Sequence, residues 1–293
     1  MRRLLLAGTL LAALLVPASS ALAVGGPHHP TGEYAQFDDC PLSKGTAISA
    51  CLLSESSAGE FKIGKKTVPL VNPVVLQAGV HWEPNIFGKI DVFAAEDGNT
   101  LVPTPQPVPG GLLGITAPSW WPSFLRNLFN ETINNGFTGV TATVELAAPA
   151  SSIKLSALNL ALGEGTALSL PTKIKLSNPF LGSNCHIGSN SSPVVLNFTS
   201  GTTSPPPPNV PITGDPGEGN ENESGTIVTF TGGRLVDNAF AAGGANGCGG
   251  LFSFLIDPFV NSIVGTPSPA GTNTAILEGK IQLADPAAVK ASE

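Results

Sequence analysis

The chain has 293 residues and a formal net charge of −7 at pH 7, and only 12% of its residues are charged although 42% are hydrophobic. Proteins that bind nucleic acid present a basic face, and disordered chains are highly charged with few apolar residues, so the composition argues against both classes. The 34 glycines and 27 prolines instead indicate many turns, as in a β protein.

The first 23 residues have the three parts of a secretory signal peptide. Arg2 and Arg3 form the basic part, residues 4–16 form a short apolar part, and small residues precede a cleavage site at Ala23. The alternative is a membrane anchor, but Pro17 ends the apolar run before the about 20 residues that cross a bilayer. We therefore expect a secreted, extracellular protein with no integral membrane segment after cleavage.

An N-terminal β region is expected in 24–117. It starts with a loop, 24–58, and short strands are predicted in 59–82 and 88–103. A proline-rich connector in 103–111 ends the region.

Residues 118–293 are expected to form a helix followed by the main β region, unless one continuous domain covers 24–293. Apolar side chains recur at helical spacing in 117–139 and in 251–265, where the Asp257-Pro258 step can divide the helix. The remaining strands are predicted in 140–147, 152–162, 173–176, 193–201, 225–240 and 274–284.

The apolar alternation changes phase within 152–162, from Ile153 and Leu155 to Leu158 and Leu160. This slip predicts a β-bulge or a turn. Taken together, the short strands and turn signals predict an all-β fold, a mainly antiparallel β-sandwich or barrel-like structure with two short helical insertions.

Four cysteines in an exported chain indicate two disulfides. Of the three pairings we prefer Cys40–Cys51 and Cys185–Cys248, because each pair lies within one half of the chain. Cys185 precedes His186, but adjacent side chains on an extended backbone point apart, and a disulfide removes the reactive thiol.

We predict no catalytic residue, metal site or cofactor, and hence a protein that is not an enzyme. The histidines, at 28, 29, 81 and 186, lack the spacing of metal ligands, and the mature chain has no Gly-x-Ser-x-Gly motif. The acidic stretch 215–223 departs from the calcium-loop pattern, so a solvated loop is preferred there and a calcium site stays open.

Aromatic side chains gather in the two helical segments. Three interpretations stay open: helices that plug the ends of the sheet, an apolar cavity for a lipid-like ligand, and an exposed surface patch. The residues of this ligand or packing cluster are Trp120, Trp121, Phe124, Phe129, Phe252, Phe254 and Phe259.

Several phrases recur together in one group of proteins. They are "FDDCPLS" (37–43), "GEFKIG" (59–64), "LPTKIKLSNPFLGSNCHIGS" (170–189), "LNFTSGTTSPPPPN" (196–209), "LVDNAFA" (235–241), "GCGGLFSFLIDP" (247–258) and "NTAILEGKIQLA" (273–284). In these phrases the chain resembles uncharacterised secreted proteins of high-GC Gram-positive bacteria. The resemblance implies an exported bacterial protein and assigns no activity.

The first functional expectation is a non-catalytic extracellular or cell-envelope-associated protein, structural or adhesive. The alternative is an extracellular protein that binds a hydrophobic, lipid-like ligand, and an unrecognised hydrolase comes third. The expected partners are an envelope component or a hydrophobic ligand, and no nucleic acid.

Overall fold

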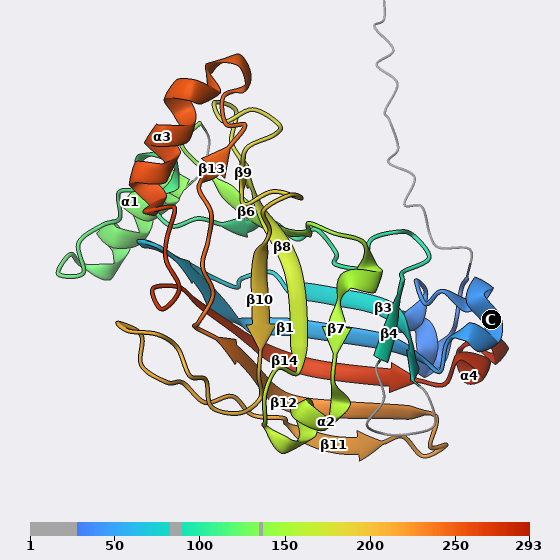
Figure 1. Ribbon diagram of the computed structural model, residues 1–293. Helices are drawn as coiled ribbons and strands as arrows, with labels where there is room; N and C mark the ends of the chain where they lie inside the picture. Colours follow the sequence, from blue (N-terminus) through green and yellow to red (C-terminus); the bar gives the residue numbers. More distant parts are fainter. Residues whose placement is uncertain (1–27, 83–89, 135–136) are drawn as a thin grey trace, which may run out of the picture.

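The computed structural model describes residues 28–82, 90–134 and 137–293, so the predicted signal peptide lies outside the described residues. Figure 1 shows the arrangement of the strands and helices. The strands are β1 (Ala50–Ile63), β2 (Lys66–Pro69), β3 (Val74–Trp82), β4 (Ile90–Ala94), β5 (Gln106–Pro107), β6 (Thr141–Leu146), β7 (Lys154–Leu155), β8 (Leu168–Ser177), β9 (His186–Ile187), β10 (Val194–Phe198), β11 (Glu218–Glu221), β12 (Ile227–Asp237), β13 (Ala245–Asn246) and β14 (Thr274–Ala284). The α-helices are α1 (Ser123–Asn134), α2 (Ala157–Leu162), α3 (Ser253–Val264) and α4 (Pro286–Ala291).

The strands form one antiparallel sheet that closes on itself. Hydrogen-bonded neighbours follow the order β12-β14-β1-β3-β4-β7-β8, and β10 pairs with β8. Directly after β10, Thr199 pairs with Val236 of β12 through two backbone hydrogen bonds of 3.0 and 2.9 Å. Figure 1 shows β8 and β10 crossing steeply over β1 and β14. The predicted mainly antiparallel β fold is confirmed, and its form is a barrel.

Two β-bulges, one in β1 and one in β12, lie opposite the same residue of β14 and bend the central strands. The register of β1 against β14 shifts between Ser56 and Ala58, and that of β12 against β14 shifts between Phe230 and Gly233. Gly279 lies opposite both Ser56 and Gly233, where a Cβ atom would meet the carbonyl oxygen of Glu55 at 1.9 Å. Bulges and glycines let strands curve sharply, as closure of a barrel requires.

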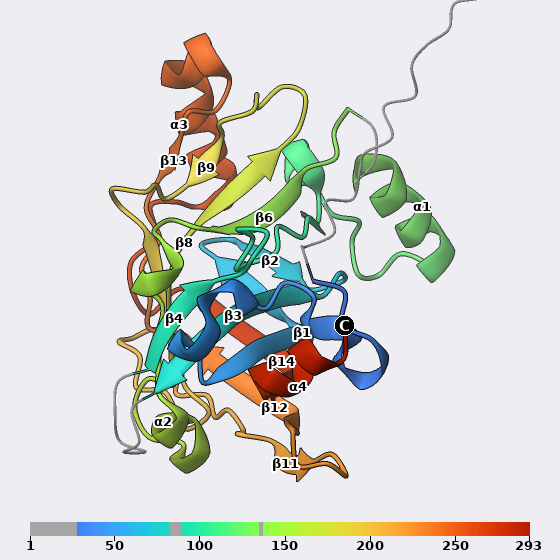
Figure 2. The ribbon, with the colours of Figure 1, turned by 90° about the vertical axis from the view of Figure 1, so that its right-hand side faces the viewer.

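The barrel interior is filled by alternate side chains of its strands. In β8 every second residue is buried, and β10 buries Val194, Leu196 and Phe198, so the predicted period of two is confirmed here. A second core lies on the outer face of β1 and β14, where the N-terminal segment and α4 cover the sheet. Figure 2 shows α4 and the first described residues side by side, and the N–H of Thr31 donates to the Ser292 carbonyl.

Three local predictions are wrong. The slip in 152–162 is neither a bulge nor a turn, because Leu158 and Leu160 belong to α2. The Ser156 hydroxyl accepts the Asn159 N–H at 3.2 Å, and Gly163 ends the helix in the left-handed conformation. These caps satisfy the ends of a helix that the apolar spacing does not indicate.

The other two corrections concern the start of β1 and the continuity of α3. β1 begins at Ala50, inside the predicted loop 24–58. The Asp257-Pro258 step does not divide α3. Both predicted helices are present as α1 and α3, and the described residues also form the short helices α2 and α4.

Both preferred disulfides are present, Cys40–Cys51 and Cys185–Cys248, and all four cysteines are buried. Disulfides of this kind persist in oxidising compartments, which fits an extracellular protein. Among the described residues, none of the helices has the length and apolar character needed to cross a membrane.

Candidate functional site

Helices α1 and α3 lie at the same end of the barrel. In Figure 1 this end is at the upper left, away from α4 and the C-terminus, and Figure 2 shows the helices on two sides of it. α3 packs on β13, and α1 packs on the short turn Gly111–Leu113. The aromatic residues predicted as one cluster therefore come to one end of the molecule on two separate helices.

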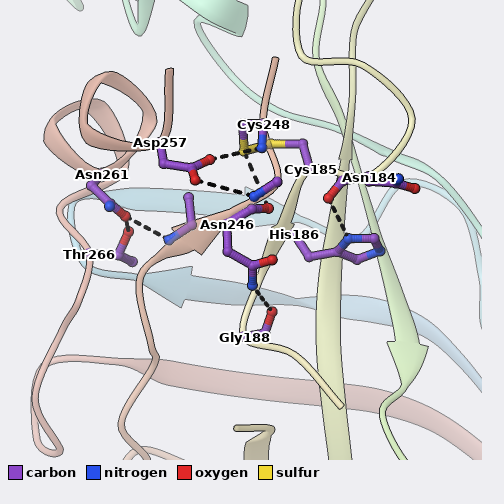
Figure 3. The surroundings of a disulfide bond; sticks show 11 residues. Asn184, Cys185, His186, Gly188, Asn246, Cys248, Asp257, Asn261 and Thr266 are labelled. Atoms are coloured by element: carbon purple, nitrogen blue, oxygen red, sulfur yellow. Dashed lines mark hydrogen bonds between the residues drawn. A yellow bond between two sulfur atoms is a disulfide. The ribbon is translucent and has the colours of Figure 1, made fainter. Parts of the chain in front are cut away.

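The polar side chains of α3 point toward the barrel. The Asp257 carboxylate accepts the backbone N–H of Cys248 at 2.8 Å and that of Gly247 at 3.2 Å. The Asn261 side-chain oxygen accepts the N–H of Ala245 at 2.7 Å. Figure 3 shows both side chains directed at the β13 segment. Val260 completes this inner face and is buried.

The outer face of α3 and of the turn before it is apolar. Leu251 is 94% exposed and Phe254 is 70% exposed, and Phe252, Leu255 and Phe259 are exposed as well. A surface helix normally turns its polar side chains to water and its apolar side chains to the core. α3 does the opposite with Asp257 and Asn261, so its exposed side chains are mainly apolar, with Ser262 as a polar exception.

α1 exposes a second apolar face. Trp120 is 80% exposed, and Phe124 and Leu128 are exposed beside it. Trp121 and Phe129 are half-buried and pack edge to face with ring centroids 5.6 Å apart. These two side chains hold the segment together, while the other three face outward.

Two loops near the helices also expose apolar side chains, Phe137 and Phe180. The Asn178 side chain donates to the carbonyl of Phe137 at 2.8 Å, and Phe180 follows it in the turn after β8. The Leu181 carbonyl accepts the N–H of Gly249, just before α3. We call the exposed side chains of this region the apolar end. They are Trp120, Phe124, Leu128, Phe137, Phe180, Leu251, Phe252, Phe254, Leu255 and Phe259.

The predicted cluster does not include five of these side chains. Leu128 and Leu255 lie in the predicted helical segments but are not assigned to the cluster, and Leu251 is the first residue of the second segment. Phe137 and Phe180 are isolated apolar residues in turns, which carry no periodic signal. The leucines lie in helical segments that the sequence already identifies, so counting every large apolar side chain of these segments would have included them.

The Cys185–Cys248 disulfide anchors the apolar end to the barrel. It joins the segment before β9 to the turn before α3, and both cysteines are fully buried. Figure 3 shows the His186 imidazole pointing away from the disulfide, and its Nδ1 lies 3.0 Å from the Asn184 carbonyl. Its Nε2 lies 3.5 Å from Glu145. The two neighbours in sequence thus do not form one site.

Positive charge lies at the base of α3. The ammonium group of Lys65 donates to the Ser262 carbonyl at 3.3 Å. Lys66 lies beside Gly114 and is half-buried, and this burial lowers the pKa of its ammonium group. On α1, Arg126 donates to the Ser119 carbonyl at 3.3 Å.

The other histidines lie away from the apolar end. His28 Nδ1 lies 2.6 Å from the Glu293 carboxylate, and His29 is exposed. His81 Nδ1 lies 3.0 Å from the Ser49 hydroxyl, the hydroxyl–imidazole contact that a hydrolase would need. Neither His81 nor Ser49 lines one of the two best-formed hollows of the described residues.

The acidic stretch 215–223 is exposed, but part of it is the edge strand β11 and not a loop. The Asp215 carboxylate accepts the N–H of its own turn at Gly217, and β11 spaces Glu218 and Glu221 along the backbone. No group of three or more potential metal ligands occurs among the described residues.

The interior offers little space for a ligand. The two best-formed hollows among the described residues have volumes of about 20 and 10 Å³. A water molecule needs about 10–15 Å³ by the same measure. Neither hollow holds a lipid-like molecule, so a large hydrophobic ligand would have to bind on the surface.

Comparison with known protein families, with curated proteins and with solved structures finds no match to this chain.

Proposed function

We propose that this protein is a secreted, non-catalytic component of the cell exterior that attaches to an apolar surface of the envelope through the apolar end. The observation that carries the proposal is the orientation of α3. Its Asp257 and Asn261 face the barrel while Leu251, Phe254 and Leu255 face outward. The signal peptide expected in residues 1–23 delivers the chain to the compartment where its disulfides persist.

Exposed apolar side chains on this scale are costly in water. Full burial of a leucine or phenylalanine side chain is worth about 1.5–3 kcal/mol, and exposed apolar side chains that gather in one region mark interaction sites. Because the side chains come from two helices and two loops, their common location depends on the whole fold. The fold therefore brings these side chains to one end of the molecule, where a partner surface can cover them.

The lipid-like ligand remains the second candidate, at the same place. The hollows of the described interior are too small for it, so the exposed faces of α1 and α3 would have to hold it. Native mass spectrometry of the secreted protein tests this candidate, because a bound lipid adds a defined mass.

Sedimentation with bacterial envelope fragments tests the proposed function. We expect the purified secreted protein to sediment with the fragments, and the double variant Phe254→Ser/Leu255→Ser to stay in solution. Val210→Ser is the matched control, because Val210 is exposed in a loop outside the apolar end. Equal sedimentation of wild type and the double variant would show that the apolar end is not the attachment surface.

A further inference from the structure

We propose that the surface bound by the apolar end is a lipid membrane with anionic headgroups, with α3 lying in the plane of the interface. This inference rests on the proposed function and names its partner. Three independent features support it: the length and composition of α3, the cations at its base, and the position of the hollows.

The length of α3 suits an interfacial helix. Its 12 residues span about 18 Å, well short of the roughly 30 Å of a hydrocarbon core. Helices that lie in the interface bury large apolar and aromatic side chains a few ångströms deep. Leu251, Phe254 and Leu255 meet this requirement, and the exposed Trp120 in the turn before α1 is of the residue type enriched at the headgroup level.

The cations of the β1–β2 turn are fixed beneath the C-terminal end of α3. The backbone N–H of Lys65 donates to the Val264 carbonyl at 2.7 Å, and its ammonium group reaches Ser262. The fully buried Asn273 side chain accepts the N–H of Gly64 at 2.9 Å and so holds the same turn. Lys66 begins β2 directly after the turn, and its ammonium group lies beside Gly114 and near Ile263 of α3. Two ammonium groups therefore lie near the C-terminal end of α3.

Carboxylates near this face do not cancel the two ammonium groups. Asp257 is directed inward at backbone N–H groups, and Glu131 lies on α1 with Arg126. The acidic side chains of β11, Glu218 and Glu221, lie on the other side of the barrel, at the lower right in Figure 1. An acidic protein with this distribution would meet an anionic membrane with its apolar end first.

Neither of the two best-formed hollows among the described residues belongs to the apolar end. Hot-spot side chains of protein interfaces insert into pockets on the other partner. The two best-formed hollows of the described chain lie elsewhere, one lined by Leu160, Leu235 and Leu277 and the other by Phe37 and Leu53. A bilayer needs no socket, since its acyl chains adapt to protruding side chains.

Vesicle flotation with the purified secreted protein tests the inference. We compare vesicles of phosphatidylcholine alone with vesicles that also contain phosphatidylglycerol, at low and high salt. We expect binding to the anionic vesicles to be roughly tenfold stronger or more at low salt, with the difference shrinking as salt screens the charges.

Variants of Lys65 and Lys66 test whether these two residues cause the preference for anionic vesicles. Lys65→Gln/Lys66→Gln should weaken binding to anionic vesicles by roughly tenfold or more. The single variant Lys65→Gln, at an exposed position, should weaken it by about fivefold without disturbing the half-buried Lys66. Lys290→Gln, on α4 at the other end, is the matched control and should bind as wild type does. Circular dichroism confirms that each variant is folded.

Three outcomes would overturn the inference, and they show whether the proposed function stands or fails with it. Equal binding to neutral and anionic vesicles shows that headgroup charge plays no part, while apolar attachment stands. Sedimentation with envelope fragments but with neither kind of vesicle points to a protein or glycan partner. Failure to bind fragments and vesicles alike removes both proposals.

Discussion

At the scale of single residues, buried polar side chains decide where the segments around the barrel lie. Asp257 holds the turn before α3, and Asn273 holds the β1–β2 turn. Asp237, 2% exposed, accepts the N–H groups of Asn197 and Ala239 at 2.6 and 2.9 Å. Each of these side chains satisfies backbone donors that would otherwise be unpaired in the interior, which is why short polar residues stand at these positions.

Replacing Asp257 with alanine should release the start of α3. The change leaves the N–H groups of Gly247 and Cys248 without their acceptor, and such a loss costs about 1–3 kcal/mol. Urea denaturation measures the free energy of unfolding. Glu223→Ala removes an exposed carboxylate elsewhere and serves as the control. An Asp257→Ala protein as stable as this control would show that the carboxylate does not hold the turn.

Asp237 should make the stability of the fold depend on pH. Burial raises the pKa of this carboxyl group above its ordinary 3.8, and the N–H groups of Ala239 and Asn197 oppose the rise. Between the unfolded and folded pKa values the folded state binds more protons, so stability falls as pH rises through that window.

The measurement is the difference in free energy of unfolding between wild type and Asp237→Asn, taken at several pH values. Wild type should lose stability relative to the variant as pH rises from below 3.8 toward neutrality. A difference that stays constant over this range would contradict the raised pKa of Asp237.

At the scale of the elements, some structures are set by nearby residues, such as helix caps, and others by pairing between strands that are distant in the sequence. The Ser156 and Gly163 caps make a helix of α2 although its leucines alternate as in a strand. The bulges at Ser56 and Phe230 arise where β1 and β12 meet β14, and Gly279 lets the three backbones approach. The need for glycine at position 279 comes from close contact with Glu55 and Ser56, which are distant in the sequence. Local sequence around Gly279 therefore does not reveal it.

Gly279→Ala should destabilise the barrel. Its Cβ would meet the Glu55 carbonyl oxygen at 1.9 Å, so the central strands must shift. Overpacking of this kind costs about 1–3 kcal/mol. The control is Gly243→Ala, where the nearest atom to a Cβ is 3.9 Å away. Thermal unfolding of both variants gives the comparison, and equal melting temperatures would argue against a tight bulge at Gly279.

At the scale of the whole molecule, two cores share one closed sheet. The barrel interior is one, and the other lies outside β1 and β14, where residues near both chain ends cover the sheet. Phe37, Ile48 and Val289 belong to this outer core. The apolar end lies at the opposite end of the barrel in Figure 1, so a defect in the outer core should change stability without changing attachment.

Val289→Ala tests this separation. Val289 is fully buried, and removing its methyl groups should cost about 1–3 kcal/mol of stability while vesicle binding stays as in wild type. Val210→Ala, at an exposed loop position, should change neither quantity. Loss of vesicle binding in a folded Val289→Ala protein would show that the two ends are coupled.

The sequence by itself determined the antiparallel β character, the longer strands of the second half (β6, β8, β10, β12 and β14) and the two disulfide pairs. Alternation in β8 and β10 is a local signal, and an even number of cysteines in two halves leaves few pairings. The presence of α1 and α3 was equally readable, because apolar spacing over three turns is a strong pattern.

Only the tertiary structure decided how the barrel closes and which side of α3 faces water. Closure depends on Thr199 meeting Val236, and such pairing between distant residues has no local signature. The spacing of Asp257 and Asn261 places both on one side of α3, and a polar side of this kind ordinarily faces water. In the tertiary structure their side chains instead accept the N–H groups of Cys248 and Ala245, and the phenylalanines face outward.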